Sequence, residues 1–358
     1  MSKVAINGFG RIGRAFFKLA ITPAVAGAGL EIVAINDLGD LNDLAYLLQH
    51  DSVYGSYDKE VSVADPDAAV GAGGKLIVDG KQYTFIQEKD VTKLPWGQLG
   101  VDIVIESTGA FESYEKASVH KQAGAKHVVI TAPAKDEDGS VNSPQVTADG
   151  RTVLMGVNEE DLKTCSISSN GSCTTNSASP VMQILSEKLG VKKAFLNTTH
   201  GYTATQSLVD GPTKGSDFRR GRAGAVNITP STTGAAIAVA RAVKSLAGKF
   251  DGIALRVPVA SGSISAITFI SERPTTAEEI NSILKTAESE PRWQGIFKTT
   301  TEQLVSSDII GEAHAAVADL NLTKVVDGDL CCVYSWYDNE FGYTNSLIQH
   351  VLKVAEEI

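Results

Sequence analysis

A short apolar segment followed by three spaced glycines is the feature that most constrains the fold of this chain. Residues 4–6 are apolar, and Gly8, Gly10 and Gly13 follow in the spacing G-x-G-x-x-G, ahead of a helical apolar pattern over residues 15–20. A strand, a tight turn and a helix in this order let the backbone approach a dinucleotide pyrophosphate, with the phosphates at the helix N-terminus. The spacing alone is a weak signal, so its context carries the prediction of a dinucleotide-binding fold.

An acidic residue at the end of the next apolar run supports this prediction. Residues 31–35 are mostly apolar and lead to Asn36 and Asp37, which lies 24 residues after Gly13. A carboxylate at this distance binds the ribose hydroxyls of the adenosine and repels a 2′-phosphate. No arginine follows directly, so NAD is favoured over NADP. The alternative, that Asp37 only caps a turn, is less favoured.

Two later apolar runs predict more strands of the same sheet. Residues 101–106 and 128–131 are nearly continuous apolar runs of the kind that parallel sheets bury on both faces. Ser107 and Thr108 follow the first run, and Thr131 ends the second. Ligands lie at the carboxyl ends of such strands. The N-terminal part therefore predicts an α/β, Rossmann-type doubly wound domain.

The second half of the chain has a different pattern. A length of 358 residues is long for one core and suits two domains. Residues 201–230 show little apolar periodicity, and so long a loop is usually functional or disordered. Strand-like runs alternating with helical stretches then predict an α+β domain with a mainly antiparallel sheet. The strand-like runs are residues 255–259, 263–270 and 330–336, and the helical stretches are residues 236–246 and 277–287.

Charge and cysteine usage exclude several classes of function. A net charge of −10 disfavours a general nucleic-acid binder. The four cysteines lack metal-ligand spacing, so we expect no metal site and thiols in a reducing cytoplasm. No apolar run is long enough to span a membrane, and the N-terminus leads directly into a strand, so we expect neither a membrane anchor nor a signal peptide.

Cys173 is the first candidate for a catalytic residue. It lies among small hydroxyl and amide side chains over residues 168–176, just before the apolar run 181–185, where we expect a helix to begin. The N–H groups and dipole of a helix N-terminus lower the pKa of a thiol and can stabilise an oxyanion. The alternative is an ordinary buried cysteine. The polar neighbourhood favours the reactive role.

His200 is the candidate partner of Cys173. Residues 195–203 predict a strand that ends in a loop, and catalytic side chains are often displayed at such ends. A histidine beside a cysteine can accept its proton. Taken alone, His200 could equally be a structural histidine, and the sequence cannot place the two side chains together.

Five motifs together resemble the phosphorylating glyceraldehyde-3-phosphate dehydrogenases along the whole chain. They are Asn-Gly-Phe-Gly-Arg-Ile-Gly at residues 7–13, Asn36-Asp37, Ser-Cys-Thr-Thr-Asn at 172–176, His200, and Trp-Tyr-Asp-Asn-Glu at 336–340. The resemblance implies an NAD-binding domain over residues 1–172, joined by a C-terminal helix at about 340–358. It also implies a catalytic domain over residues 173–339 with an S-shaped loop at about 201–230, and a homotetramer.

The same resemblance implies a role for each matching residue. Cys173 and His200 would be the catalytic pair. The cofactor-binding residues would be Gly8, Gly10, Arg11, Ile12, Gly13, Asp37, Ser107, Thr108, Thr131 and Asn339. Thr203 and Arg256 would bind the substrate phosphate, and Ser172, Thr174, Thr233 and Gly234 the attacking phosphate, with Arg222 nearby.

The reaction implied is oxidation of an aldehyde by NAD through a cysteine hemithioacetal and a thioester, which phosphate then opens. Two alternatives stay open. One is an erythrose-4-phosphate dehydrogenase, which Asp37 and residues 131–134 disfavour. The other is a non-catalytic NAD-binding redox sensor on the same fold, which has little need of two anion sites.

Overall fold

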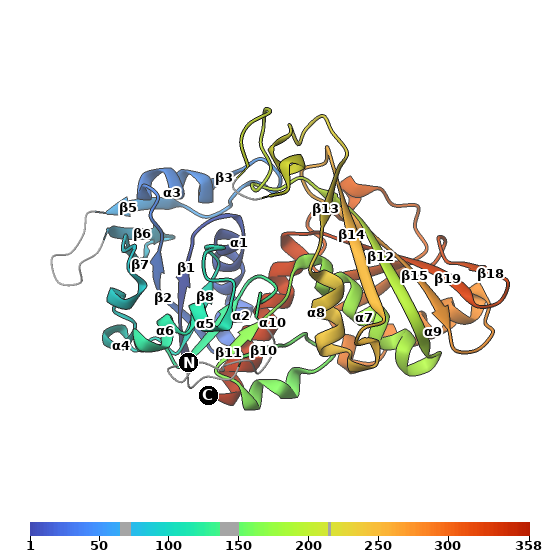
Figure 1. The fold of residues 1–358 in the computed structure, drawn as a ribbon. Coiled ribbons are helices and arrows are strands. Elements are labelled where there is room, and N and C mark those ends of the chain that lie inside the picture. Colours follow the sequence, from blue (N-terminus) through green and yellow to red (C-terminus); the bar gives the residue numbers. More distant parts are fainter. Residues whose placement is uncertain (65–72, 137–149, 214–215) are drawn as a thin grey trace. The chain divides into compact units, whose positions relative to one another are not determined.

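The computed structural model describes residues 1–64, 73–136, 150–213 and 216–358, and its ribbon is shown in Figure 1. Within these residues the chain divides into two compact units. Unit 1 comprises Met1–Val153, Glu159–Gly171 and Leu347–Ile358, and unit 2 comprises Leu154–Asn158 and Ser172–Ser346. Each unit is built around its own large sheet.

The sheet of unit 1 has nine strands among the described residues, in the order β10-β11-β9-β8-β1-β2-β7-β6-β5. All pairs from β10 to β7 are parallel, and β5 and β6 add an antiparallel edge. The strands are β1 Ser2–Asn7, β2 Leu30–Asn36, β5 Val61–Ala64, β6 Gly74–Val78, β7 Lys81–Ile86, β8 Ile103–Glu106, β9 His127–Ile130, β10 Gly150–Thr152 and β11 Ile167–Ser169. The predicted doubly wound fold is confirmed.

The chain winds outward from β1 in both directions. It passes from β1 to β2 and β7 on one side, then returns to β8 and continues to β9 on the other. This reversal makes the carboxyl ends of β1 and β8 the switch point at which such sheets bind ligands. The four residues of β8 and those of β9 are all buried, as expected of parallel strands covered on both faces.

The sheet of unit 2 is mainly antiparallel, as predicted. Its order is β13-β14-β12-β15-β19-β17-β16, and β18 pairs with β19. Only the pairs β12–β14 and β16–β17 are parallel. The strands are β12 Val191–Gly201, β13 Thr229–Thr232, β14 Phe250–Val257, β15 Ser263–Ser271, β16 Phe297–Thr300, β17 Ala316–Asp319, β18 Lys324–Val326 and β19 Leu330–Tyr337. The two-residue strands β3 His50–Asp51 and β4 Gly55–Ser56 pair separately.

The helices are α1 Arg11–Ala20, α2 Pro23–Gly27, α3 Leu41–Gln49, α4 Trp96–Leu99, α5 Tyr114–Ala117, α6 Val119–Gln122, α7 Cys173–Lys188, α8 Ala235–Ala242, α9 Ala277–Glu288 and α10 Phe341–Glu357. The helix predicted over residues 236–246 is wrong at its C-terminal end: α8 stops at Ala242, and Lys244–Leu246 forms a separate 3₁₀ turn. Val243 breaks the helix because its ψ of 81° lies outside the helical region. Among the described residues, no helix has both the length and the apolar character needed to cross a membrane.

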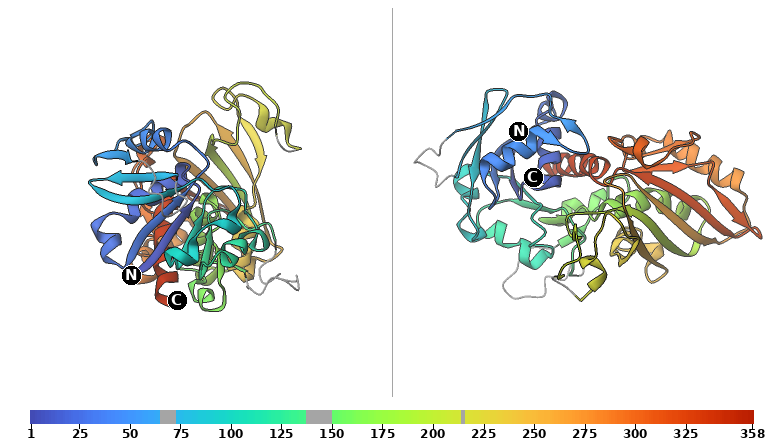
Figure 2. Two further views of the ribbon diagram at one scale, coloured as in Figure 1. Left: turned by 90° about the vertical axis from the view of Figure 1, so that its left-hand side faces the viewer. Right: turned by 90° about the horizontal axis from the view of Figure 1, so that it is seen from above.

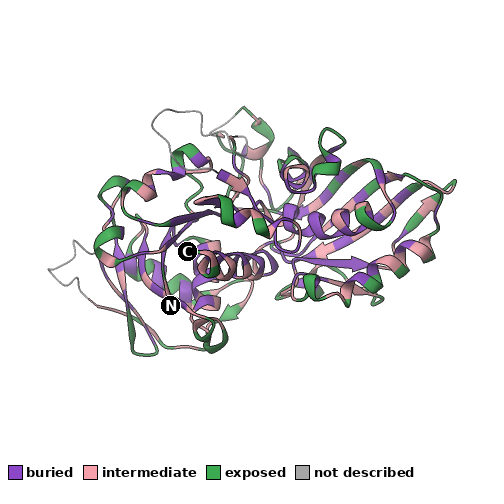
Figure 3. Ribbon diagram, turned by 90° about the horizontal axis from the view of Figure 1, so that it is seen from below, coloured by how far each residue is buried: buried purple, intermediate pink, exposed green. Residues whose placement is uncertain are grey.

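One face of the unit 2 sheet is covered and the other is open. Helix α7 packs against β15, β17 and β19. Along β15 the buried residues alternate with less buried ones, and Figure 3 shows such alternation along the long strands of this unit, which run side by side in Figure 2. Alternation of this kind is typical of a sheet that buries one face.

Candidate active site

Cys173 is the first residue of helix α7, as the sequence predicts. Ser172 caps the helix: its Oγ accepts a hydrogen bond of 3.1 Å from the Thr175 N–H. Thr175 Oγ1 in turn accepts one of 3.1 Å from the Ser172 N–H, which completes a reciprocal capping box. Two backbone N–H groups are thereby satisfied by side chains. The cap fixes where the helix begins and so where the sulfur lies.

His200 lies one residue before the end of β12 and meets Cys173 within unit 2. Its Nε2 is 3.3 Å from the Cys173 Sγ. The imidazole is almost fully buried, with 2% of its surface exposed, while Cys173 is only partly buried. Residues 27 apart in sequence are therefore in hydrogen-bond contact. A proton can pass between sulfur and nitrogen at this distance without rearrangement.

The Nδ1 of His200 lies near one hydrogen-bond acceptor and one hydrogen-bond donor. The Gly201 carbonyl oxygen lies 2.6 Å away and can only accept, whereas Arg256 Nη1 lies 2.7 Å away and can only donate. With the Nδ1 proton directed at Gly201, the lone pair of Nε2 faces the sulfur and can take its proton. Arg256 Nη1 also lies 3.3 Å from the Gly201 oxygen, so the guanidinium keeps a partner when Nδ1 donates.

The strand register explains why Arg256 reaches His200. Strands β12 and β14 run parallel, and His200 pairs directly with Arg256 in this ladder. The Arg256 Nε is buried and has no hydrogen-bond partner among the described residues. A buried guanidinium N–H without a partner is costly, and an anionic ligand would satisfy it. This fits the expected phosphate-binding role of Arg256.

The expected lowering of the Cys173 pKa is wrong. Burial of the sulfur raises the pKa of the Cys173 thiol above its ordinary value. The positive charge of Arg256, the Thr174 hydroxyl and the first N–H groups of the helix all favour the thiolate, but together they do not outweigh desolvation. The helix N-terminus therefore lowers the pKa of Cys173, as expected, but burial raises it by more.

Burial also lowers the pKa of His200 to about 3, with the charges of Arg256 and Arg220 adding to the effect. The hydrogen bond to Gly201 opposes the shift. His200 is thus neutral near pH 7. A neutral imidazole can accept the thiol proton, so the pair is arranged for general-base catalysis rather than for a standing ion pair.

Tyr337, at the end of β19, is a contact of the pair that sequence reasoning missed. Its hydroxyl lies 2.9 Å from Thr174 Oγ1 and 2.7 Å from Thr198 Oγ1, and its ring meets the His200 ring edge-on with centroids 6.0 Å apart. Tyr337 therefore fixes the side chain of Thr174 and one face of the imidazole. Tyr337 belongs to the motif at residues 336–340, in which the resemblance assigns a role to Asn339 alone.

The residues expected to bind phosphates are brought together only in part. Thr203 Oγ1 lies 3.0 Å from Thr205 Oγ1, to which Arg220 Nη1 donates at 3.0 Å. Arg220 Nη2 also donates to Ser231 Oγ at 2.7 Å, and its charge acts on both His200 and Arg256. Arg222 instead forms an exposed ion pair of 2.8 Å with Asp210. The structure thus favours Arg220 over Arg222, whose role stays a prediction.

Sequence reasoning could have weighed Arg220, because Arg219, Arg220 and Arg222 form one cluster. Residues 214–215 of the predicted S-shaped loop lie outside the described residues.

The other expected phosphate ligands lie at two helix starts in unit 2. Ser172 and Thr174 flank Cys173 at the start of α7. Thr233 and Gly234 precede α8, which packs against α7, and Thr233 Oγ1 accepts a hydrogen bond of 3.2 Å from the Ala235 N–H. Within the described part of the chain, neither Thr233 nor Gly234 forms a hydrogen bond with Cys173, so their roles stay predictions.

The side-chain amide of Asn339 is hydrogen-bonded through its oxygen. Its Oδ1 accepts from Ser263 Oγ at 2.9 Å and from the Gly262 N–H at 3.2 Å. Ser263 Oγ also accepts from the Gly201 N–H at 3.2 Å. The amide orientation is therefore fixed, with Nδ2 as the donor that remains for a ligand such as a carboxamide oxygen.

In unit 1 the glycine loop joins β1 to α1 and fits a dinucleotide. A Cβ on Gly13 would lie 2.1 Å from the Gly8 carbonyl oxygen, so only glycine allows the helix to pack this closely on the strand. Gly8 adopts a φ of +99°, which side-chain-bearing residues rarely adopt. Gly10 caps α1 without a side-chain hydrogen bond and has open space around its Cβ direction. The start of α1 is therefore accessible to phosphates.

Asp37 lies at the carboxyl end of β2, beside this loop. Its Oδ2 accepts from the Phe9 N–H at 2.6 Å and its Oδ1 from the Gly39 N–H at 2.8 Å. Each oxygen retains a lone pair for a ribose hydroxyl. Arg11 and Ile12 form the first turn of α1, and Arg11 pairs with Asp51 at 3.2 Å.

Ser107, Thr108 and Thr131 follow the neighbouring strands β8 and β9 at the same sheet edge. Ser107 Oγ donates to the Gly8 carbonyl at 2.6 Å, and Thr131 Oγ1 donates to the Glu106 carbonyl at 3.1 Å. Thr108 bonds through both its N–H and its hydroxyl to the Glu106 carboxylate. The nine expected cofactor residues of unit 1 thus gather at the ends of adjacent strands.

Comparisons with known proteins match both units. A family model described as the NAD binding domain of glyceraldehyde 3-phosphate dehydrogenase matches residues 2–114. A second, described as the C-terminal domain of glyceraldehyde 3-phosphate dehydrogenase, matches residues 172–339. The resemblance seen in the motifs is therefore confirmed.

Similar proteins named glyceraldehyde-3-phosphate dehydrogenase occur in Clostridium pasteurianum, Thermotoga maritima and Geobacillus stearothermophilus. They are 43%, 47% and 43% identical to this chain, respectively. The alignments cover 99%, 97% and 99% of this chain and 100%, 97% and 98% of the relatives. The similarity thus extends over almost the entire length of both partners.

Proposed function

Because the chain belongs to the glyceraldehyde-3-phosphate dehydrogenase family, we propose that it converts D-glyceraldehyde 3-phosphate, NAD⁺ and phosphate to 1,3-bisphosphoglycerate and NADH in glycolysis or gluconeogenesis. The cofactor is NAD, in agreement with the matched NAD-binding domain. The observation that carries the proposal is the distance of 3.3 Å between Cys173 Sγ and His200 Nε2. A nucleophile and a base in contact are what addition to an aldehyde requires.

The first step forms a bond between Cys173 Sγ and the aldehyde carbon. The thiol proton passes to His200 Nε2 and then to the aldehyde oxygen, which gives a hemithioacetal. Backbone N–H groups at the start of α7 stabilise the charge that develops on this oxygen. Neutral His200 is suited to this step, because an imidazolium could not accept the proton.

In the second step the hemithioacetal becomes a thioester. His200 Nε2 takes the hydroxyl proton while the carbon loses a hydride, for which bound NAD supplies the acceptor. A phosphate oxygen then attacks the thioester carbon and the carbon–sulfur bond breaks. The departing sulfur recovers a proton from His200, and the attacking phosphate loses its own proton to solvent.

We assign the anions to the two groups of residues described above. Arg256 and Thr203 bind the substrate phosphate, and Ser172, Thr174, Thr233 and Gly234 bind the attacking phosphate. The unsatisfied Nε of Arg256 supports the first assignment. Asn339, through its free Nδ2 donor, orients the nicotinamide carboxamide. We further propose that residues 1–172 and about 340–358 bind NAD, and that residues 173–339 carry catalysis.

A spectrophotometric assay tests this function. We expect NADH to appear with glyceraldehyde 3-phosphate only when phosphate or arsenate is present, and Cys173→Ser to abolish the reaction while NAD still binds. Greater turnover of erythrose 4-phosphate would indicate the sister enzyme. NAD binding without turnover of either aldehyde would contradict the enzymatic proposal and favour a sensor.

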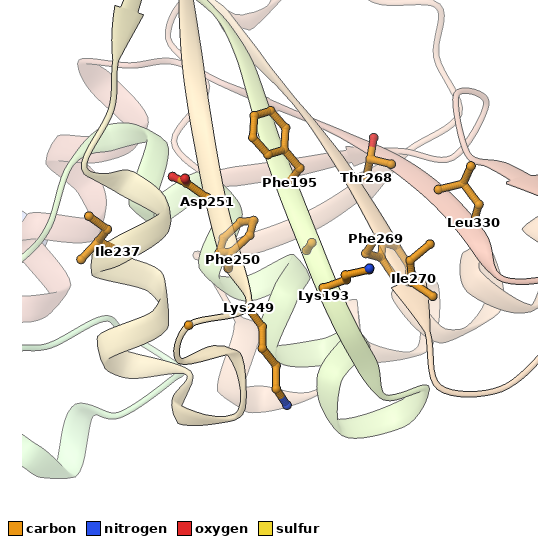
Figure 4. Close-up of a pocket in the computed structure, with 12 residues that line it drawn as sticks. Lys193, Phe195, Ile237, Lys249, Phe250, Asp251, Thr268, Phe269, Ile270 and Leu330 are labelled. Atoms are coloured by element: carbon orange, nitrogen blue, oxygen red, sulfur yellow. The ribbon is translucent and has the colours of Figure 1, made fainter.

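The compartment and assembly are also proposals. The four cysteines form no disulfide with one another, which suits a reducing cytoplasm. The open face of the unit 2 sheet has a hollow of about 710 Å³. Figure 4 shows Phe195, Phe250 and Leu330 along it, together with charged Lys193 and Asp251. An apolar patch with charges of both signs suits self-association, and we propose a homotetramer.

A further inference from the structure

Glu106, the last residue of β8, is a buried carboxylate directly beneath the dinucleotide loop. Only 2% of its surface is exposed. Buried carboxylates are costly unless every oxygen is paired. Glu106 lies at the switch point of the sheet, and apolar packing does not explain a charged residue there.

Four side-chain and backbone donors satisfy this carboxylate. On one side, Oε2 accepts from Asn7 Nδ2 at 2.6 Å and from His120 Nε2 at 2.9 Å. On the other side, Oε1 accepts from the Thr108 N–H at 2.9 Å and from the Thr108 hydroxyl. Each oxygen of the Glu106 carboxylate therefore accepts two hydrogen bonds. Thr108 Oγ1 in turn accepts from the Ala110 N–H at 3.1 Å, so its hydroxyl is fully committed.

The direction of this hydrogen-bond chain is fixed by Trp96. The indole Nε1 can only donate, and it lies 3.1 Å from His120 Nδ1, which must therefore accept. The other ring nitrogen, Nε2, is then the donor to Glu106. Asn7 is set in the same way, because its Oδ1 accepts from Asn36 Nδ2 at 2.7 Å. Glu106 must therefore accept on this side.

Glu106 connects residues that are expected to contact the cofactor. Its carboxylate shapes the turn at Ser107 and Thr108, and its main-chain carbonyl accepts from both the N–H and the hydroxyl of Thr131. The turn lies against the loop glycine, since a Cβ on Gly8 would lie 2.7 Å from the Thr108 nitrogen. A shift of the turn would therefore move the glycine loop as well.

We propose that Glu106 is a positioning residue for NAD: its carboxylate, oriented by Trp96 through His120, holds the turn at residues 107–108 against the glycine loop in the conformation that binds the cofactor. The proposal rests on the cofactor-binding role proposed for Ser107 and Thr108. It assigns to Glu106 no contact with NAD itself.

The test is Glu106→Gln, with the NAD dissociation constant measured by calorimetry. The glutamine amide can accept only through its oxygen. Its NH₂ group must therefore point at other donors, either those of Thr108 or those of Asn7 and His120. We expect NAD to bind about ten- to a hundredfold more weakly, the cost of breaking a buried hydrogen bond to a charged group. We also expect faster hydrogen exchange at the Thr108 amide before any NAD is added.

Ser168→Ala is the matched control, because it disrupts another buried polar cluster of unit 1, at His127 and His350. We expect this control to lower the unfolding temperature but leave NAD affinity within about twofold of the parent. Equal NAD affinity in Glu106→Gln and the parent would overturn the proposal. An equal loss of NAD affinity in Glu106→Gln and Ser168→Ala would overturn it as well. A parent chain that does not bind NAD would instead contradict the proposed function.

A double variant tests the direction of the chain. In Glu106→Gln with Trp96→Phe, the lost indole N–H allows His120 to carry its proton on Nδ1 and to accept from the new amide. We expect the double variant to bind NAD more tightly than Glu106→Gln alone, although Trp96→Phe by itself gives no gain. Double-variant affinity equal to or below that of Glu106→Gln would refute the role given to Trp96 and His120.

Discussion

At the scale of single residues, the environment of His200 decides what the catalytic pair can do. Burial and the charge of Arg256 keep the imidazole neutral, while burial keeps the thiol of Cys173 protonated. The two shifts act together, since each disfavours the charged form of its own group. In the reaction proposed above, the proton therefore passes from Cys173 to His200 only when the substrate reacts.

This leads to a prediction for His200→Asn. The amide keeps a polar side chain at the end of β12 but cannot accept the thiol proton, so we expect kcat to fall by about 10²- to 10⁴-fold. The burst of NADH in the first turnover should slow by a similar factor. NAD affinity should be unchanged, and calorimetry provides that control. A variant with a burst as fast as that of the parent would show that another group takes the proton.

Some of the site was accessible from residue types and motifs, and some was not. Cys173 and His200 belong to motifs that the sequence itself shows, whereas Arg256 follows only from the family resemblance; the structure brings all three together. The sign of the Cys173 pKa shift was wrong, because desolvation depends on the burial of the sulfur and a sequence does not show burial. Sequence patterns do not single out Tyr337 and Glu106, because each acts through contacts that form only on folding; Arg220 does stand in a visible basic cluster, but only the fold distinguishes it from Arg222.

At the scale of elements, strands β9 and β11 and helix α10 share a buried polar cluster in unit 1. Ser168 Oγ lies 2.9 Å from His127 Nε2 and 2.7 Å from His350 Nε2. His350 Nδ1 lies 3.1 Å from Asn170 Oδ1, to which it donates, so its Nε2 accepts from the Ser168 hydroxyl. A second proton on His350 would break this arrangement, because its Nε2 could no longer accept from the Ser168 hydroxyl.

The cluster predicts a loss of stability in mild acid. Burial lowers the pKa of His127 and of His350 to about 3, from 6.5 in an exposed histidine. Below pH 6.5 the unfolded chain therefore binds protons that the folded chain does not, and stability falls as pH falls. We expect a loss of about 1 kcal/mol per histidine per pH unit between about pH 6.5 and pH 5, measured by urea unfolding.

Two variants separate this effect from general charge. His350→Gln should reduce the pH slope, because one titrating group is gone. His50→Gln, at an exposed position, should keep the parent slope. A parent chain whose stability is flat or rises on acidification over this interval would contradict the prediction.

At the scale of the whole molecule, the exposed apolar side chains on the open sheet face bear on how the chains associate. Phe195 on β12 and Ile237 on α8 are 49% and 56% exposed, and both line the hollow of Figure 4. Apolar patches of this kind on a folded protein usually mark an interface. A second copy presenting the same face would bury both side chains.

The proposed homotetramer gives a prediction for Phe195→Glu. We expect sedimentation equilibrium to show four chains in the parent and a smaller species in this variant, because burying a charged carboxylate in place of an apolar ring disfavours the interface. Val326→Glu, at an exposed position on β18 outside the hollow, should remain a tetramer. A parent that sediments as one chain, or a Phe195→Glu variant that stays tetrameric, would argue against this face as an interface.

The sequence by itself determined the order of elements and the doubly wound fold and pointed to Cys173 as the candidate nucleophile, since glycine spacing, apolar runs and a specific set of motifs are local properties of the chain. Only the tertiary structure decided which residues meet: the register of β12 against β14 brings Arg256 to His200, and the packing of β1, β8 and α6 surrounds Glu106 with donors. Protonation states belong to this second group. They depend on burial and on neighbours distant in sequence, which exist only once the chain has folded.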